Sequence, residues 1–396
     1  MRKWTDKEES YLRDNPSQTN AEIGKILNRS EDAIDRKRRR LGLKVPEPII
    51  SIPDEIKKEE RKLEDSLNAK KIKYLIDEIK KIEKERDALL QVGGVETYSI
   101  KQKGESEKSP ACSITLCSDW HYEEPIKSSQ VNGLNRFDTT IAKERIEKLF
   151  KVISQLIKVH QKEYQIDTHI LALLGDFISG SIYDDLKEAN HIQPTQAIWE
   201  VQNLIASGIE FLLETTDVNL VIPCSSGNHG RMTEKQRTAT EFGNSLEILM
   251  YRQLEKYFSN NKRVKFIIND SYLTYIDVFN WSCRFHHGHS LRYSGGIGGI
   301  FIPAYKAISQ WNKSRKADFD FFGHFHQLKD GGNFICNGSL IGYNAYAIKI
   351  KADYEKPKQA FIIIDKERGM DVVRKITLEN KGSFRPSPFK TINIYE

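Results

Sequence analysis

The stretch ACSITLCSDWH, at residues 111–121, joins an apolar run to a polar end. Residues 111–117 are small, apolar or β-branched, which is typical of a buried strand. Directly after this run, Asp119 and His121 stand two positions apart. Where the chain turns out of a sheet, a carboxylate and an imidazole at this spacing can point at one ion, and both are common ligands of zinc, manganese and iron. A single D-x-H motif is weak evidence, because it occurs often by chance.

The same arrangement recurs farther along the chain. Further strands are predicted for the apolar runs at 168–174, 218–224, 264–268, 282–286 and 319–322. Helices are predicted at 140–160 and 192–213. Polar motifs follow four of the runs, namely GD at 175–176, SSGNH at 225–229, HHGH at 286–289 and GHFH at 323–326. Alternating strands and helices predict an α/β domain with a layered core over residues 110–375.

Histidine usage supports reading these motifs together. The chain has ten histidines. Seven fall inside the motifs: His121, His229, His286, His287, His289, His324 and His326. One histidine is usually structural, but packing does not explain seven at strand ends beside Asp, Asn and Gly. We therefore interpret the motifs as one metal centre.

The ordered series D-x-H, G-D, G-N-H, H-G-H and G-H-x-H resembles the calcineurin-like metallophosphoesterases. This family includes phosphatases and the nucleases related to the bacterial double-strand-break repair exonuclease. The resemblance spans residues 111–344. It implies an α/β (α+β) four-layer sandwich, in which two facing β-sheets are flanked by helices.

The resemblance also implies a set of site residues. Two divalent metal ions are expected, with Mn²⁺ favoured and Fe or Zn as alternatives. One ion would be held by Asp119, His121, Asp176 and His326. The other would be held by Asp176, Asn228, His287 and His324, so that Asp176 bridges the two ions. His229 would bind no metal and would protonate the leaving oxygen, which makes His229, Asp176 and Asn228 the expected catalytic residues.

Two departures from the family pattern narrow the expectation. In Ser/Thr protein phosphatases, a second Asp three residues after the bridging Asp orients the catalytic His, and an Arg follows it. Here these positions are Ser179 and Gly180, and Gly230 replaces the acid that usually follows G-N-H. Protein phosphatase activity is therefore disfavoured, and Asp184 or Asp185 is expected to orient His229 instead.

Substrate contacts are predicted from residues beside the motifs. These are Arg231, His289 and Tyr122. The Gly-rich segment at 294–299 is a further candidate, as a loop over the substrate. His286 is expected in the strand or behind the ligands.

Residues 1–44 are predicted to form a small all-helical unit. A T-x-x-E capping box at 19–22, a cap at Ser30 and a stop at Gly42 delimit its last two helices. The pattern resembles Myb/SANT-like or homeodomain-like helix-turn-helix units of bacterial and phage proteins. Its last helix is basic, so nucleic-acid contacts are predicted at Arg36, Lys37, Arg38, Arg39, Arg40 and Lys44. A protein-interaction module with a solvated basic helix is the alternative.

Residues 45–109 are predicted to be a linker that contains a long charged helix at about 54–91. Its apolar spacing permits a coiled-coil homodimer, or a helix lying on the next domain. Residues 376–396 form a tail without a usable pattern. We find neither an apolar run long enough for a membrane helix nor a secretory leader, so we expect a cytoplasmic protein without a membrane partner. The five cysteines show no CxxC spacing and are expected as buried free thiols.

The leading hypothesis is a metal-dependent phosphodiesterase, or nuclease, that acts on DNA or RNA. A phosphatase or phosphodiesterase of small nucleotides or phosphomonoesters is the first alternative. The second is a DNA-binding regulatory protein in which the phosphoesterase fold is a non-catalytic scaffold.

Overall fold

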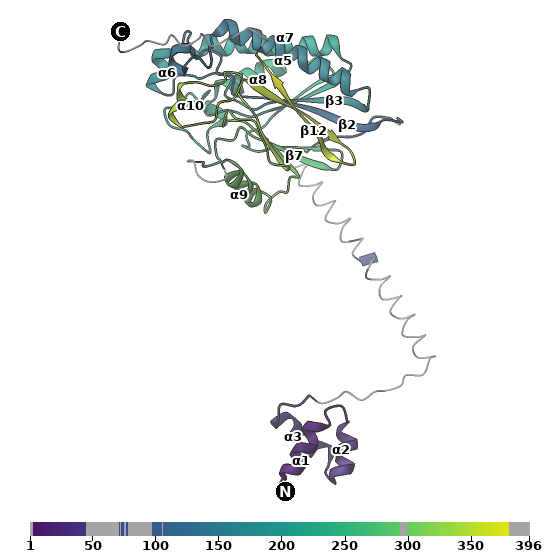
Figure 1. Cartoon of the computed structure of the whole chain (residues 1–396). Coiled ribbons are helices and arrows are strands. Elements are labelled where there is room, and N and C mark those ends of the chain that lie inside the picture. The colour runs from purple at the N-terminus through teal and green to yellow at the C-terminus, as the bar shows by residue number, and fades with distance from the viewer. Residues whose placement is uncertain are drawn as a thin grey trace, which may run out of the picture. The chain divides into compact units, whose positions relative to one another are not determined.

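The computed structural model describes residues 3–44, 71, 73, 74, 77, 97–104, 106–293 and 299–379 (Figure 1). The chain divides into two compact units, Met1–Val95 and Glu96–Glu396. Three predicted features lie largely or wholly outside the described residues: the connector helix at 54–91 with its possible dimer contact, the Gly-rich loop at 294–299, and the tail beyond residue 379.

The first unit contains three helices, α1 (Asp6–Asp14), α2 (Asn20–Leu27) and α3 (Glu31–Arg40). They bury Leu12, Ile23 and Ile34 completely. The predicted capping box at Thr19 is present, because its side chain accepts from the Glu22 backbone while the Glu22 carboxylate accepts from the Thr19 backbone. Ser30 precedes α3 as predicted, but its side chain makes no capping hydrogen bond.

The prediction that Arg38 contacts nucleic acid is wrong. Arg38 is fully buried, four residues after the core residue Ile34, so the helical period turns it inward. Its guanidinium donates to the Asn20 side chain at 3.0 Å and to the carbonyls of Asn15 and Gln18 at 3.1 and 2.7 Å. Arg38 therefore ties α3 to the segment before α2 and is not available to a phosphate.

The other cations predicted to contact nucleic acid differ in exposure and in ion pairing. Lys37 is only partly exposed and pairs with Glu9 of α1. Arg39 pairs with Asp35 at 2.9 Å but remains 76% exposed. Exposed cations among the predicted residues are Arg36, Arg39, Arg40 and Lys44.

The second unit contains two six-stranded sheets. Sheet A has the order β1 (Tyr98–Ile100), β6 (Thr274–Val278), β7 (Trp281–Phe285), β8 (Phe319–Phe322), β10 (Phe334–Cys336) and β9 (Lys329–Asp330). Sheet B has the order β12 (Gly369–Thr377), β11 (Lys358–Asp365), β2 (Ser109–Cys117), β3 (Tyr164–Leu173), β4 (Asn219–Cys224) and β5 (Val264–Ile268). Strands β2 to β5 are parallel, and β11 and β12 complete sheet B as antiparallel strands.

Helices cover the outer face of each sheet. The helices described in this unit are α5 (Thr139–His160), α6 (Asp184–Ala189), α7 (Pro194–Thr215), α8 (Leu246–Tyr257), α9 (Phe301–Trp311) and α10 (Ala345–Lys349). Short 3₁₀ turns lie at Ser128–Val131 and Phe242–Asn244. Helices α5, α7 and α8 pack on sheet B, and α9 packs on sheet A (Figure 1). The two facing sheets flanked by helices agree with the predicted sandwich.

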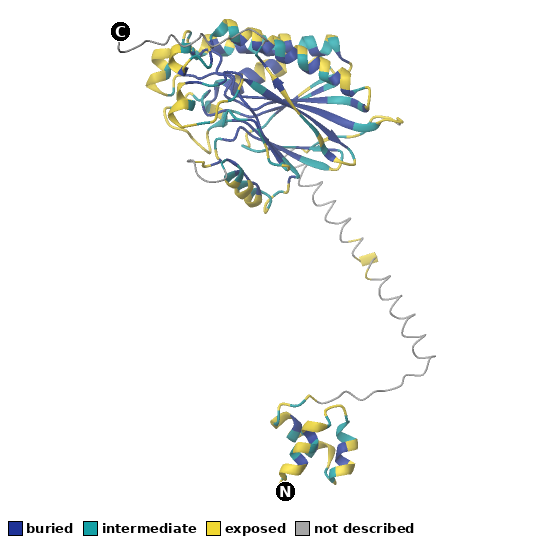
Figure 2. Cartoon of the chain, in the orientation of Figure 1, coloured by how far each residue is buried: buried dark blue, intermediate teal, exposed yellow. Residues whose placement is uncertain are grey.

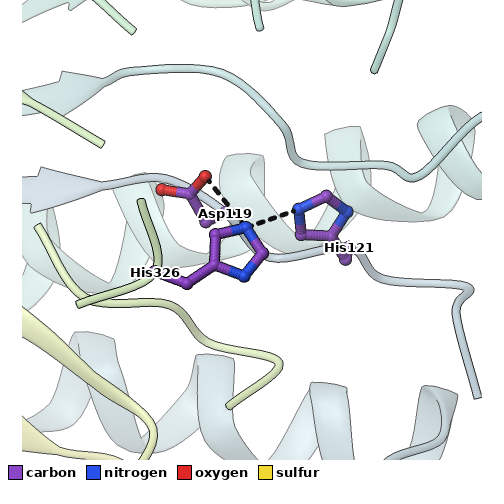
Figure 3. Close-up of side chains that lie close together, drawn as sticks. All are labelled: Asp119, His121 and His326. Atoms are coloured by element: carbon purple, nitrogen blue, oxygen red, sulfur yellow. Dashed lines mark hydrogen bonds and ion pairs between the residues drawn. The ribbon is translucent and has the colours of Figure 1, made fainter. Parts of the chain in front are cut away.

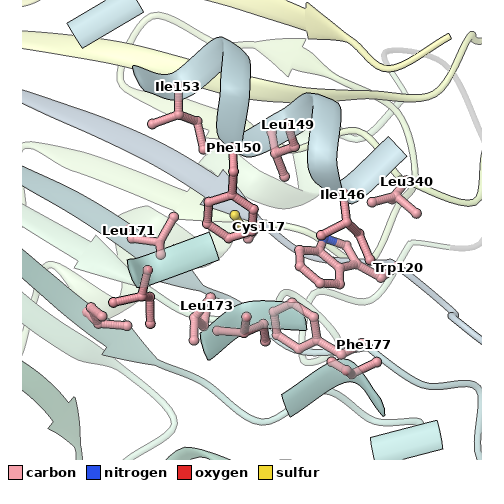
Figure 4. Packing of buried hydrophobic residues seen from close by; sticks show 14 of the residues in the cluster. Cys117, Trp120, Ile146, Leu149, Phe150, Ile153, Leu171, Leu173, Phe177 and Leu340 are labelled. Atoms are coloured by element: carbon pink, nitrogen blue, oxygen red, sulfur yellow. The ribbon is translucent and has the colours of Figure 1, made fainter. Parts of the chain in front are cut away.

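Alternation along the strands separates the apolar layers. In β2, Ile114 and Leu116 face the layer between the sheets, whereas Ala111 and Cys117 face the layer under the helices. Figure 4 shows the helix layer, where Trp120 and Phe177 meet edge to face at 4.7 Å between ring centroids. Burial is densest along both sheets (Figure 2). The core thus reaches up to the loops that carry the polar motifs.

The boundaries differ from those predicted at both ends. Strand β1 lies inside the predicted linker 45–109, yet it pairs in parallel with β6, with Tyr98 opposite Ile276. At the other end, β12 continues to Thr377, and Leu378 is buried, beyond the predicted limit at 375. The described part of this unit therefore runs from the strand β1 to residue 379.

All five cysteines are free and buried, as predicted. Within the described ranges, no helix has the length and apolar character needed to cross a membrane.

Candidate metal centre

The predicted site residues follow strands that end at a common edge. Strands β2, β3 and β4 are parallel neighbours in sheet B, and β7 and β8 are parallel neighbours in sheet A. The carboxyl ends of parallel strands meet at one edge of a sheet, where ligands bind in α/β folds. The loops after these five strands carry Asp119, His121, Asp176, Asn228, His229, His287, His289, His324 and His326.

The structure brings most of these side chains within reach of one another. Possible ligand atoms lie within 4.8 Å of each other in three groups: Asp119, His121 and His326; His121, Asp176 and His229; and Asp176, His287 and His324. Asp176 lies within 4.8 Å of His121, a member of the first group, and also of His287 and His324 in the third group. That is the position that a bridging ligand requires.

The first group converges from two strands, as Figure 3 shows. His326 Nε2 lies 3.1 Å from His121 Nε2 and 3.5 Å from Asp119 Oδ1. The other ring nitrogen of His121, Nδ1, is 2.8 Å from Ser179 Oγ. This contact orients the ring and leaves Nε2 as the ligand atom, which is the usual arrangement of a metal-binding histidine.

In the third group, of Asp176, His287 and His324, a ring nitrogen of His287 is oriented in the same way. His287 Nδ1 is 2.6 Å from the carbonyl oxygen of Leu174, so Nδ1 carries the proton and Nε2 faces Asp176 Oδ2 at 2.9 Å. Asn228 is 8% exposed, and its Oδ1 has no hydrogen-bond partner. An orphaned buried oxygen costs about 1–3 kcal/mol, which coordination to a cation would offset. The donor set therefore fits two divalent cations that share Asp176.

The backbone of the site is held in an unusual conformation. Asp119, His121, Asp176, His324 and His326 have φ angles of 56°, 46°, 53°, 71° and 56°. For residues other than glycine, the left-handed region costs on the order of 1–3 kcal/mol each, and such residues cluster at functional sites. Five of the nine described non-glycine residues with positive φ are thus predicted ligands.

Burial and charge set the protonation of the ligands. Burial holds the pKa of His121 and of His324 well below the usual range, so both imidazoles are neutral, as metal ligation requires. Burial alone would lower the pKa of His287, but the Asp176 carboxylate outweighs it and raises that pKa to about 10, so His287 would have to release a proton on binding a cation. Burial acts to raise the pKa of Asp176, yet His287 and His229 hold it well below its usual range. Asp176 is therefore ionised.

His229 is oriented by the backbone. Its N–H donates to Asp176 Oδ1 at 2.8 Å, and its Nδ1 lies 2.9 Å from the carbonyl oxygen of Ser179. The expectation that Asp184 or Asp185 orients His229 is wrong, because both are exposed and Asp184 pairs with Lys187. A carbonyl at Nδ1 leaves Nε2 as the atom that can exchange a proton with a substrate.

The three predicted substrate contacts have different environments. Tyr122 is fully buried, and its hydroxyl donates to Glu200 at 2.5 Å, so it is not a substrate contact. Arg231 donates to the carbonyls of Asn228, Thr233 and Glu234 at 2.6 to 3.2 Å, so it braces the loop rather than presenting a free guanidinium.

His289 and His286 lie nearer to their predicted places. The His289 ring is 5.5 Å from that of His287, and its Nε2 is 3.2 Å from Glu241 Oε1. His286 is buried and stacks on Phe322, behind the ligands.

Sequence patterns missed Glu247, which joins two of the ligand loops. It is fully buried on α8, where Oε1 accepts from the N–H of Phe177 and Oε2 accepts from the N–H of Gly227, both at 2.7 Å. Phe177 directly follows Asp176, and Gly227 directly precedes Asn228. Burial first, and then the charge of Asp176, raise the pKa of Glu247 to about 8, although the two N–H donors act to lower it.

Two glycines make this arrangement possible. A Cβ at Gly227 would lie 2.1 Å from Asp176 Oδ1. A Cβ at Gly230 would lie 2.7 Å from Glu247 Cγ, so the Glu247 side chain leaves no room for a larger residue at position 230. The sequence signal for Glu247 is an acid inside the apolar run at 246–251, at the start of α8.

Glu123 also holds the loop that follows β3. Its carboxylate accepts from the N–H groups of Ser179 and Gly180 at 3.1 and 2.8 Å, and burial raises its pKa to about 7. Two buried carboxylates thus hold the segment that carries Asp176 and the carbonyl that orients His229.

Comparisons with known proteins add little. No protein-family model and no curated protein match this sequence. Among solved structures, the chain is similar to a hypothetical protein of Pyrococcus horikoshii, with 11% identity over 68% of this chain and 89% of the other, and a TM-score of 0.32. It is similar to a candidate 5′-nucleotidase of Staphylococcus aureus, with 10% identity over 72% of this chain and 56% of the other, and a TM-score of 0.28. It is also similar to Vps29 of Chaetomium thermophilum, with 9% identity over 66% of this chain and 94% of the other, and a TM-score of 0.24. All three scores are below 0.5, so the function proposed below rests on the site alone.

Replacing Glu247 by Gln tests the role of this clamp. The amide keeps one acceptor but turns an NH₂ group toward the second N–H donor, so one loop is released. We expect Mn²⁺ affinity, measured by calorimetry, to fall about 10- to 100-fold, as for other residues that support ligands from behind. Glu255→Gln is the matched control, because Glu255 is exposed on the same helix. A folded Glu247→Gln variant that binds Mn²⁺ like the wild type would show that the clamp is not needed.

Proposed function

We propose that this chain is a two-metal phosphoesterase of the calcineurin-like type, and that it hydrolyses phosphodiesters of DNA or RNA. The observation that carries the proposal is the position of Asp176, which lies within reach of His121 on one side and of His287 and His324 on the other, while the His229 N–H donates to it. Neutral buried imidazoles, ionised Asp176 and the orphaned Asn228 oxygen support metal binding there. Mn²⁺ is the ion we favour, with Fe or Zn as alternatives.

The residues of the site fit a direct hydrolysis in which water attacks the phosphoester without a covalent enzyme intermediate. Two cations held in this donor set would supply the charge that acidifies a water molecule and neutralises the phosphoryl oxygens. The water loses a proton to solvent and the resulting hydroxide attacks phosphorus. The bond between phosphorus and the leaving oxygen breaks, and its electron pair stays on that oxygen. His229 Nε2 then gives its proton to the leaving oxygen, while the Ser179 carbonyl holds the Nδ1 proton and keeps the ring in place.

The first test uses Mn²⁺ with labelled single- and double-stranded DNA and RNA. We expect hydrolysis of one or more of them, a rate lower by about 10²–10⁴ for His229→Ala with Mn²⁺ still bound, and loss of both binding and turnover for Asp176→Ala. His191→Ala is the control, because His191 is an exposed histidine outside the ligand groups. Turnover of small phosphomonoesters or nucleotides without any cleavage of polymers would replace the nucleic-acid assignment with the small-substrate alternative. If neither the polymers nor the small substrates are hydrolysed, the phosphoesterase fold is better explained as a non-catalytic scaffold.

We further propose that the first unit binds nucleic acid through the exposed cations Arg36, Arg39, Arg40 and Lys44. Arg38 is left out because its donors are used inside the unit. Phosphate binding by these cations would release counterions and depend on salt. Such binding would deliver the polymer substrate to the same polypeptide that hydrolyses it.

The triple change Arg36→Gln, Arg39→Gln and Arg40→Gln tests this second proposal. We expect weaker DNA binding by the full chain and a slope of log K against log salt that is shallower by about 0.9 for each phosphate that the variant no longer neutralises. Hydrolysis of a dinucleotide should not change. Lys7→Gln, Arg13→Gln and Lys25→Gln together form the control, because they remove the same charge from exposed positions on α1 and α2. If both triple variants weaken DNA binding equally, the effect depends only on net charge and the α3 cations form no specific site.

A further inference from the structure

An exposed aromatic ring stands beside the proposed general acid. Tyr183 is 56% exposed, and its ring centroid lies 6.1 Å from that of His229, with the two planes at 71°. Exposed aromatic side chains are ordinary when isolated, and Tyr257 at the end of α8 is another, at 65%. Tyr183 differs because its neighbour is His229, the residue proposed above to protonate the leaving oxygen.

The backbone around Tyr183 is fixed. Tyr183 precedes α6, and its carbonyl accepts from the N–H groups of Leu186 and Lys187, both at 3.1 Å. On the far side of α6, the Asn190 amide donates to the Gly180 carbonyl at 2.7 Å. The segment 181–189, which carries Tyr183, is therefore joined at its end to Gly180, whose N–H donates to Glu123. A ring on such an anchored segment loses little conformational entropy when it binds a ligand.

Arg231 supports the same ring. Its guanidinium carbon is 5.9 Å from the Tyr183 centroid, within the range of a cation–π contact. Three backbone carbonyls hold this guanidinium in place, so it serves as a fixed neighbour of the ring. Arg231, which the sequence predicts as a substrate contact, thus lies against an aromatic ring.

We propose that Tyr183 is the stacking surface for the base of the leaving nucleoside. This inference rests on the function proposed above. A general acid must stand next to the leaving oxygen, and the group bonded to that oxygen extends away from phosphorus past the acid. A flat, anchored and exposed ring at that point suits a planar base, because stacking accepts every base. The site is thereby assigned a substrate whose leaving group is a nucleoside rather than a small alcohol.

The experiment compares dinucleotides that differ in one base. The full chain is assayed with Mn²⁺ on dTpdT and on two analogues in which either nucleoside is replaced by an abasic tetrahydrofuran unit, and the products identify the nucleoside that leaves. Wild type, Tyr183→Ala, Tyr183→Phe and the control Tyr257→Ala are tested. Tyr257 lies ten residues after Glu247 on α8, roughly 15 Å along the helix.

We expect Tyr183→Ala to raise KM for dTpdT about 5- to 100-fold, the range that base–aromatic stacking implies, with a much smaller change in kcat. The same variant should act like wild type on the analogue that lacks the leaving base. Tyr183→Phe should keep wild-type KM, and Tyr257→Ala should change nothing. Dissociation constants measured with EDTA present, where turnover stops, should show the same pattern for dTpdT and the analogues.

Two results would overturn the inference, and they are distinguishable. If Tyr183→Ala weakens dTpdT and the leaving-side abasic analogue equally, Tyr183 contacts no leaving base, while the proposed nuclease activity stands. If wild type hydrolyses bis(p-nitrophenyl) phosphate but none of the dinucleotides, the nucleic-acid assignment itself fails and the stacking role fails with it.

Discussion

The carboxylate of Asp176 is the group around which the rest of the site is arranged. It is 1% exposed, and an ionised carboxylate in such a place must be compensated by opposite charge and hydrogen bonds. His287 lies against one oxygen, and the N–H of His229 donates to the other. The Asp176 carbonyl accepts from the N–H groups of Trp120 and His121 at 2.8 and 3.2 Å. One residue thus connects the loops after β2, β3, β4 and β7.

The sandwich explains how loops so distant in sequence meet. Parallel strands in sheet B bring three of the loops to one edge, and the facing sheet A brings the H-G-H and G-H-x-H loops to the same place. The apolar layer between the sheets sets their separation. Five of the predicted ligands have left-handed backbone at this edge. Strain of this kind persists only where surrounding contacts hold it, and the carboxylates of Glu247 and Glu123 supply such contacts.

Several features could be predicted from the sequence because their chemistry is local. The side chains that cluster in the structure stand within a few residues of apolar runs, so strand ends and polar motifs could be recognised together. Glu247 could not, because its role exists only after α8 packs beside residues 20 and 70 positions away. Strand β1 is three residues long and is formed by pairing with β6, far along the chain. The run of cations at 36–40 predicts one charged surface, but the helical period turns Arg38 into the core, which only the packed helices determine.

The central claim is that Asp176 bridges two metal ions, and anomalous diffraction from crystals grown with Mn²⁺ tests it most directly. We predict two manganese peaks about 4 Å apart, one against Asp119, His121 and His326 and the other against Asn228, His287 and His324, with Asp176 in contact with both. A single peak, or two peaks of which only one contacts Asp176, would contradict the account.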